Sequence, residues 1–318
     1  MAWLNCNWDC WENLNSKISI RDSAGAYTVR LVNALLKHDA SAISKCLSEG
    51  NVAAWINFSI VLPRGKIAGT CLHMACVFSD IGTVRQLVEA GADVHARDSA
   101  GGTPLQWLCA FNIATDFNAK LDYIITKGGE SLVNAPDNYQ NVALHKAANA
   151  GKTNTCVKLL EAGADPDINK AGTHGRTPLH RACAGGHTSC VRLLMENNAD
   201  VEARTRSKEA NETPLHVAAS FNQHDCVKAL LHDYGASINA TNKDGRTALH
   251  LAVHHGCDDA LIRTLMSHPQ CDVTIRDVNG LTVEDVAKRR SHSKVRRPRP
   301  SILHKTLARI RDLDPCWR

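Results

Sequence analysis

Residues 177–200 have the sequence T-P-L-H-R-A-C-A-G-G-H-T-S-C-V-R-L-L-M-E-N-N-A-D, and this stretch decides the fold. Its opening tetrad recurs along the chain at a spacing of about 34 residues, so the protein is built from copies of one short module. The other copies are T-C-L-H at Thr70, T-P-L-Q at Thr103, V-A-L-H at Val142, T-P-L-H at Thr213, T-A-L-H at Thr247 and a degenerate L-T-V-E-D around Thr282.

The residues of the module predict a helix, a turn, a second helix and a projecting finger. Thr caps a helix and Pro fits its first turn, so Thr177-Pro178 begins the first helix. Asp244-Gly245 is typical of a tight turn in a finger, as is Asn279-Gly280. The second helix must end at residues that tolerate the left-handed conformation. These are Gly91, Gly163, Gly235 and Asn198.

The pattern T-P-L-H-x-A-A, followed by V-x-L-L and G-A-D, resembles the ankyrin repeat family over residues 28–287. The resemblance implies an all-α solenoid of about seven stacked modules, in which each module completes the core of its neighbours. It also implies a concave face and fingers that bind other proteins. Residues 1–27 are expected to form a cap or arm. Trp3, Trp8 and Trp11 suit an amphipathic helix there, either a lid on the first module or a helix that binds a partner.

Composition excludes several classes of protein. The chain is 44% hydrophobic and only 5% aromatic, which disfavours both disorder and an all-β fold. No long apolar run or export sequence is visible, so we expect a cytoplasmic protein, with the nucleus as the alternative. The sequence contains no catalytic motif, and we predict no enzyme activity, no cofactor and no metal site.

Cysteine and histidine are abundant but have a structural interpretation. The chain has 13 Cys, and three of them, Cys156, Cys190 and Cys226, precede Val in equivalent helices, which indicates reduced packing residues. His250 and His254 have metal-site spacing. His250, however, is the fourth letter of a tetrad, so we expect a buried imidazole that bonds its own helix start or the next finger.

Departures from the module average are the candidate partner-binding residues. Large aromatic side chains are frequent binding anchors, although each could instead pack under a neighbouring helix. Charged finger residues either bind a partner or are simply solvated. Two fingers (167–176 and 201–212) are longer than the rest, and an insertion near 112–120 either reaches a partner or lengthens a loop. The candidates are Trp107, Phe111, Tyr139 and Phe221, together with Arg176, Arg204 and Arg206.

The C-terminal segment is basic, with eleven Lys or Arg and two Asp between residues 288 and 318, whereas the rest of the chain has 26 basic and 30 acidic residues. Residues 288–300 are expected to be a solvated linker or a nuclear import sequence. Sequence-specific nucleic-acid binding is not predicted, because no groove-reading motif accompanies them.

Residues 301–318 contain a helical pattern that resembles the start of the SOCS box of ankyrin-repeat and SOCS-box proteins. Ser301, Ile302 and Ile310 match that box, and Thr306 stands at its Cys position. The resemblance implies docking on elongin B/C and a role as substrate receptor of a cullin-RING ubiquitin ligase. The cullin-contacting L-P-x-P segment has no match before Arg318, so the resemblance does not extend to cullin. The alternatives are a simple terminal helix and a stand-alone scaffold or inhibitory binder.

Overall fold

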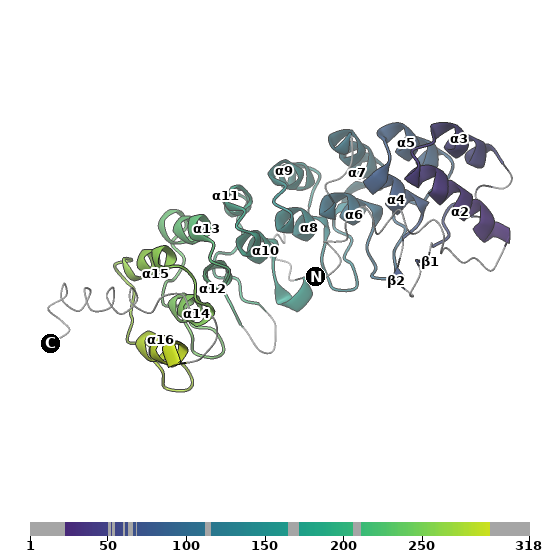
Figure 1. Ribbon diagram of the computed structural model, residues 1–318. Coiled ribbons are helices and arrows are strands. Elements are labelled where there is room, and N and C mark those ends of the chain that lie inside the picture. Colours follow the sequence, from purple (N-terminus) through teal and green to yellow (C-terminus); the bar gives the residue numbers. More distant parts are fainter. Residues whose placement is uncertain are drawn as a thin grey trace, which may run out of the picture. The chain divides into compact units, whose positions relative to one another are not determined.

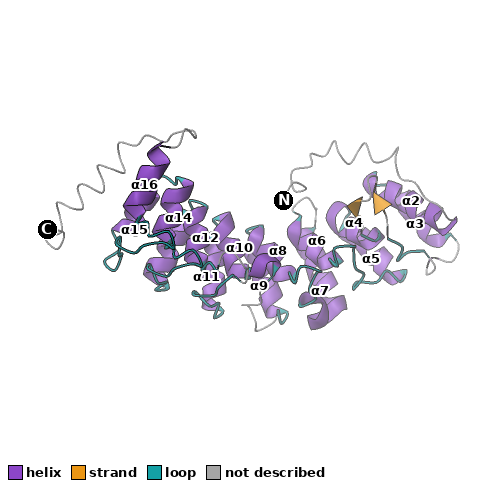
Figure 2. Ribbon diagram, turned by 90° about the horizontal axis from the view of Figure 1, so that it is seen from below, coloured by secondary structure: helices purple, strands orange, loops and turns teal. Residues whose placement is uncertain are grey.

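The computed structural model describes residues 23–49, 52, 55–59, 61–62, 66–67, 69–111, 116–164, 172–205 and 211–292. Regular structure within these ranges is helical, apart from a small antiparallel hairpin between β1 (Val61–Leu62) and β2 (Lys66–Ile67) (Figure 2). The all-α fold class predicted from the sequence is therefore confirmed. Most of the N-terminal arm, residues 112–115 of the insertion, Arg206 and residues 293–318 lie outside the described residues.

The chain forms two compact units, whose helices are labelled in Figure 1. The N-terminal unit contains Met1–Ala150 and Asn154–Pro166, and the C-terminal unit contains Gly151–Thr153 and Asp167–Arg318. In each unit, inner helices pack side by side in one layer and outer helices form a second layer.

In the N-terminal unit the inner helices are α2 (Ser23–Leu36), α4 (Cys71–Phe78), α6 (Pro104–Ala110) and α8 (Ala143–Asn149), and the outer ones are α3 (Ala40–Ser48), α5 (Ile81–Glu89) and α7 (Phe117–Val133). In the C-terminal unit the inner helices are α10 (Pro178–Gly185), α12 (Pro214–Ser220), α14 (Ala248–His255) and α16 (Val283–His292), and the outer ones are α11 (Thr188–Glu196), α13 (His224–Lys228) and α15 (Asp259–Met266). The remaining elements are α9 (Thr153–Glu161), the 3-10 turn η3 (Thr173–Gly175) and the π-helical turn η4 (Ala229–Asp233), which continues α13.

The predicted helix boundaries are found where the capping chemistry places them. Thr103 is extended and its Oγ1 accepts a hydrogen bond from the Gln106 N–H (3.3 Å), and Pro104 follows in the first turn of α6. The positions expected to be left-handed have φ of 98° at Gly91, 78° at Gly163, 64° at Gly235 and 64° at Asn198. These four helix ends therefore have the predicted conformation.

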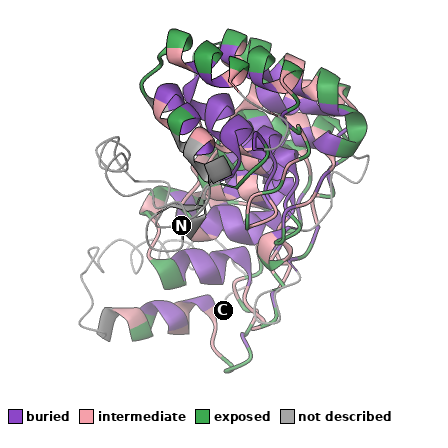
Figure 3. Cartoon of the chain, turned by 90° about the vertical axis from the view of Figure 1, so that its right-hand side faces the viewer, coloured by how far each residue is buried: buried purple, intermediate pink, exposed green. Residues whose placement is uncertain are grey.

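The core lies between helices of adjacent modules (Figure 3). The tetrad leucines are all 0–2% exposed, namely Leu72, Leu105, Leu144, Leu179, Leu215 and Leu249. Alanine or cysteine follows in the first helix, which allows close helix packing. Because one helix pair buries its apolar face only against neighbouring pairs, stability depends on stacking within each unit.

Candidate functional site

Four tetrad histidines each join an inner helix to the finger of the next module. In α4 the Thr70 N–H donates to His73 Nδ1 (3.0 Å), so Nδ1 is the acceptor and the proton is on Nε2. His73 Nε2 then donates to the Gly102 oxygen at the end of the following finger (3.1 Å). The predicted structural role of these histidines is confirmed.

The same pair of bonds recurs in the C-terminal unit. The acceptors of the Nε2 protons are Glu212 O for His180 (3.0 Å), Arg246 O for His216 (2.9 Å) and Leu281 O for His250 (3.3 Å). Burial lowers the pKa of His180 and of His216 to about 4. These imidazoles are neutral at pH 7 and fully used as hydrogen-bonding groups.

The last tetrad keeps the helix cap with a carboxylate. Asp285 stands where other modules have His, and its Oδ2 accepts from the Thr282 N–H (3.1 Å) and the Thr282 hydroxyl (2.9 Å). These bonds lower the pKa of Asp285. The degenerate copy at Thr282 therefore still begins a helix, α16.

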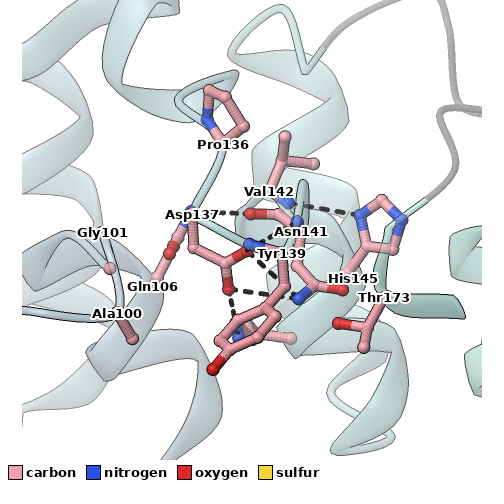
Figure 4. Close-up of polar contacts among 12 residues, drawn as sticks. Ala100, Gly101, Gln106, Pro136, Asp137, Tyr139, Asn141, Val142, His145 and Thr173 are labelled. Atoms are coloured by element: carbon pink, nitrogen blue, oxygen red, sulfur yellow. Dashed lines mark hydrogen bonds and ion pairs between the residues drawn. The ribbon is translucent and has the colours of Figure 1, made fainter.

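A carboxylate or amide closes the turn of most fingers. In the finger before α8, Asp137 Oδ1 accepts from the backbone N–H groups of Tyr139 (2.9 Å) and Asn141 (2.8 Å) (Figure 4). Burial works to raise the pKa of Asp137, but bonds from Lys146 and Asn141 outweigh it and the pKa is lowered. Equivalent turns are made by Asp98, Asn242 and Asp277.

Arginine side chains form hydrogen bonds that link neighbouring fingers. Arg97 Nη1 donates to Gly101 O in its own finger (2.7 Å) and to Pro136 O in the next (2.6 Å). Arg204, a predicted partner-binding residue, makes the matching pair of bonds, to Asn211 O (3.2 Å) and Thr241 O (2.6 Å). The guanidinium of Arg204 thus has a structural function, whatever else it contacts.

Two of the predicted aromatic anchors are partly buried beside each other in the N-terminal unit. The Trp107 indole donates to Asp98 Oδ2 (2.6 Å), and its ring lies edge-on to His73 (centroids 5.2 Å apart) and Phe111 (5.8 Å). Both rings remain half-exposed. Trp107 is therefore a rigid side chain with one accessible part.

The other two aromatic candidates are exposed. Tyr139 is at the tip of a finger and is 59% exposed, and Phe221 ends α12 and is 49% exposed. Val278, at a finger tip of the C-terminal unit, is 69% exposed and was missed from the sequence. The available clue was an apolar residue where other fingers have Ser99, Asn138 or Lys243.

The charged and C-terminal candidates divide between described and undescribed parts of the chain. Arg176 is half-buried directly before α10, beside the η3 turn. Arg206 and the predicted elongin-docking residues Ile302, Thr306 and Ile310 lie outside the described residues. The partner-binding residues therefore stay predictions.

The described part of the chain has no assembled metal site. Its His, Cys, Asp and Glu side chains form no group of three or more that could hold a metal ion. The ten cysteines in this part form no disulfide with one another, and eight of them are buried. No helix in the described ranges has the length and apolar character to cross a membrane.

Lys120, in α7, is a buried residue that the sequence did not reveal. It is 0% exposed, and its Nζ donates to Ser79 O at the end of α4 (2.6 Å). Burial lowers its pKa. The ammonium group thus lies at the C-terminal end of α4, where the helix dipole favours a positive charge.

A stack of helix pairs whose fingers are joined by repeated polar bonds defines a helical repeat protein. The sequence profile of the family Ankyrin repeats (3 copies) matches residues 72–170, 144–242 and 203–277. The chain therefore belongs to the ankyrin repeat family, whose repeats are protein–protein interaction modules.

Individual relatives share parts of the array. Rabankyrin-5 of Mus musculus is 31% identical over 148 residues, which cover 46% of this chain and 10% of that protein. The probable 26S proteasome regulatory subunit p28 of Saccharomyces cerevisiae is 27% identical over 220 residues, 68% of this chain and 92% of that protein. NF-kappa-B inhibitor delta of Mus musculus is 44% identical over 71 residues, 22% of this chain and 21% of that protein. The matched region spans only about a tenth of Rabankyrin-5.

Proposed function

We propose that this protein is a non-catalytic module that binds a protein partner through the exposed side chains of its inner helices and finger tips. The observation that carries the proposal is the exposure of Tyr139 and Phe221. The repeated His, Asp and Arg groups are occupied by bonds within the array, whereas these two rings are not required for stacking. Exposed aromatic side chains on a rigid scaffold are typical binding anchors.

Affinity capture with matched variants tests this function. The full chain, Tyr139→Ala, Phe221→Ala and Phe58→Ala are immobilised in parallel, and captured proteins are quantified by mass spectrometry. Phe58 is a suitable control, because it is similarly exposed (46%) but lies in neither an inner helix nor a finger tip. We expect at least one protein to be retained by the wild type and Phe58→Ala and reduced about tenfold by an anchor variant. Identical capture by all four proteins contradicts the proposal.

We further propose that residues 301–318 couple the array to elongin B/C, which would make the protein the substrate-recognition subunit of a ubiquitin ligase. The support is the match of Ser301, Ile302 and Ile310 to a SOCS-box helix. Purified elongin B/C should be captured by the wild type and lost with Ile302→Asp, while Lys305→Asp on the polar side of the same pattern should retain it. Failure of the wild type to capture elongin favours the rival function, a stand-alone scaffold or inhibitory binder.

The rival function, a stand-alone scaffold or inhibitory binder, includes a nuclear location. We propose residues 288–300 as the import sequence, on the basis of their clustered Lys and Arg. A fluorescent fusion that lacks these residues should lose nuclear accumulation. A fusion that remains nuclear contradicts this assignment.

A further inference from the structure

The C-terminal ends of three inner helices lie in one row in the C-terminal unit. Cys257 Sγ, just after α14, donates to Ala219 O near the end of α12 (3.1 Å). Arg290 Nη1, on α16, donates to Val253 O (3.0 Å) and His254 O (2.6 Å) near the end of α14. These bonds hold the ends of α12, α14 and α16 next to one another.

The side chains that this row exposes are one aromatic ring and several basic groups. Phe221 ends α12, His254 and His255 end α14 with their rings 5.3 Å apart, and Arg289 is exposed on α16 next to Arg290. We call these five residues the Phe221 row. Desolvation, followed by the charges of Arg246, His255 and Arg290, lowers the pKa of His254, so the positive charge of the row comes from Arg289 and Arg290.

Two carboxylates near the row are hydrogen-bonded or partly buried. Asp258 is bonded to the Asn222 amide (2.9 Å), the His224 ring (2.8 Å) and the Leu261 N–H (2.9 Å), so its charge is already partnered at the start of α15. Glu212 is half-buried, and burial raises its pKa. The row therefore has the guanidinium groups of Arg289 and Arg290 at one end and the apolar ring of Phe221 at the other.

We infer that the Phe221 row is a docking surface for an acidic peptide segment that places an aromatic or aliphatic side chain against Phe221. The inference deepens the proposed function, because it assigns a chemical class to the protein partner. Charge complementarity selects the carboxylates, and the exposed ring selects an apolar side chain between them.

A nucleic acid fits this surface less well than a peptide does. The row offers a single exposed ring, so successive bases would have no stacking series. A peptide with one apolar side chain between acidic residues needs only one such ring.

Fluorescence anisotropy with a defined probe tests the inference. The probe is a short fluorescein-labelled peptide of glutamates and glycines around one phenylalanine, and the protein is the full chain. We expect binding that weakens with added salt and is lost when the glutamates are replaced by lysines. Phe221→Ala and Arg289→Glu should each raise Kd about tenfold. Lys228→Glu, which makes the same charge change on the exposed side of α13, should leave Kd unchanged.

Three outcomes overturn the inference. They are absence of probe binding, equal loss of binding in Lys228→Glu and Arg289→Glu, and tighter binding of oligodeoxythymidine than of the peptide with the same variant pattern. Because Phe221 and Arg289 are exposed, we expect both variants to keep the wild-type melting temperature. A melting curve of each variant tests whether unfolding causes a loss of binding. If the probe fails while Tyr139→Ala still removes a captured protein, only this inference fails and the proposed function stands.

Discussion

The Gln106 side-chain amide donates to the Asn141 carbonyl oxygen at 3.0 Å, in place of the imidazole bond that His73 makes to Gly102 one module earlier. Gln106 Nε2 also reaches Ala135 O (2.7 Å), but its Oε1 is buried without a hydrogen-bond partner among the described residues. The link between an inner helix and the next finger therefore requires a directed N–H donor, and imidazole adds an acceptor for the helix start.

The natural exchange at Gln106 predicts the effect of the same exchange elsewhere. His180→Gln or His216→Gln should leave the C-terminal unit folded at pH 7.5, with a loss of about 1 kcal/mol because the helix start loses its Nδ1 acceptor. Urea unfolding followed by circular dichroism measures this loss. A loss as large as that of a buried Leu→Ala variant would show that glutamine cannot make the finger bond here.

The same variants should reduce acid sensitivity. The pKa of His180 and His216 is about 4 in the folded chain and about 6.5 when unfolded, so between these values only the unfolded state takes up protons. The contribution of each histidine to the free energy of unfolding is fully present above pH 6.5. It decreases as the pH falls toward 4, by about 3 kcal/mol for each histidine at the lower limit. Between pH 7.5, 6 and 5, the urea midpoint should decrease less in the variants than in the wild type. His95→Gln, at an exposed site, should retain the wild-type slope.

Trp107 and Phe221, grouped together from the sequence, should differ in their effect on stability. Trp107→Ala removes the indole bond to Asp98 and two ring contacts, so we expect a loss of about 2–4 kcal/mol. Phe221→Ala should change stability by less than about 1 kcal/mol, since nearly half of the side chain is exposed. Thermal melts of both variants provide the comparison, and equal losses would mean that Phe221 is a packing residue.

Module boundaries and caps were predictable from the sequence, because they depend on local residues. Thr103-Pro104 and Gly91 act through backbone conformation, and a tetrad histidine bonds a residue three positions earlier. Periodicity then places each copy against the next.

Features that depend on neighbouring modules were not predictable in the same way. The stretch from Cys226 to Gly235 has one residue more than that from Cys190 to Asn198, and only the structure places the extra residue in the π-helical turn Ala229–Asp233. Equally, exposure separates Tyr139 from Trp107, although both are aromatic departures from the module average. Exposure is set by the packing of adjacent helices and not by residue type.

The buried cysteines should be unreactive until the array unfolds. Burial raises the pKa of Cys71 and of Cys76 to about 12, so almost no thiolate exists near neutral pH. Pulse labelling with iodoacetamide and peptide mass spectrometry should modify these two residues only in denaturant. Cys257 is half-exposed and should be labelled earlier. Rapid native labelling of Cys71 would contradict its burial.

Lys120 should be a stabilising residue despite its buried charge. It occupies the helix position of Cys190 and Cys226, but its longer side chain reaches the Ser79 carbonyl at the end of α4. Lys120→Ala removes this donor and leaves a cavity, so the unfolding free energy should fall by about 2–4 kcal/mol. Lys120→Met refills most of the volume and removes the cost of burying the ammonium group, so it should lose about half as much. Denaturant titrations with Lys127→Ala, at an exposed site of the same helix, supply the reference. If Lys120→Met is as stable as the wild type, the bond to Ser79 only offsets the cost of burial, and the lysine fills space without strengthening the contact between α4 and α7.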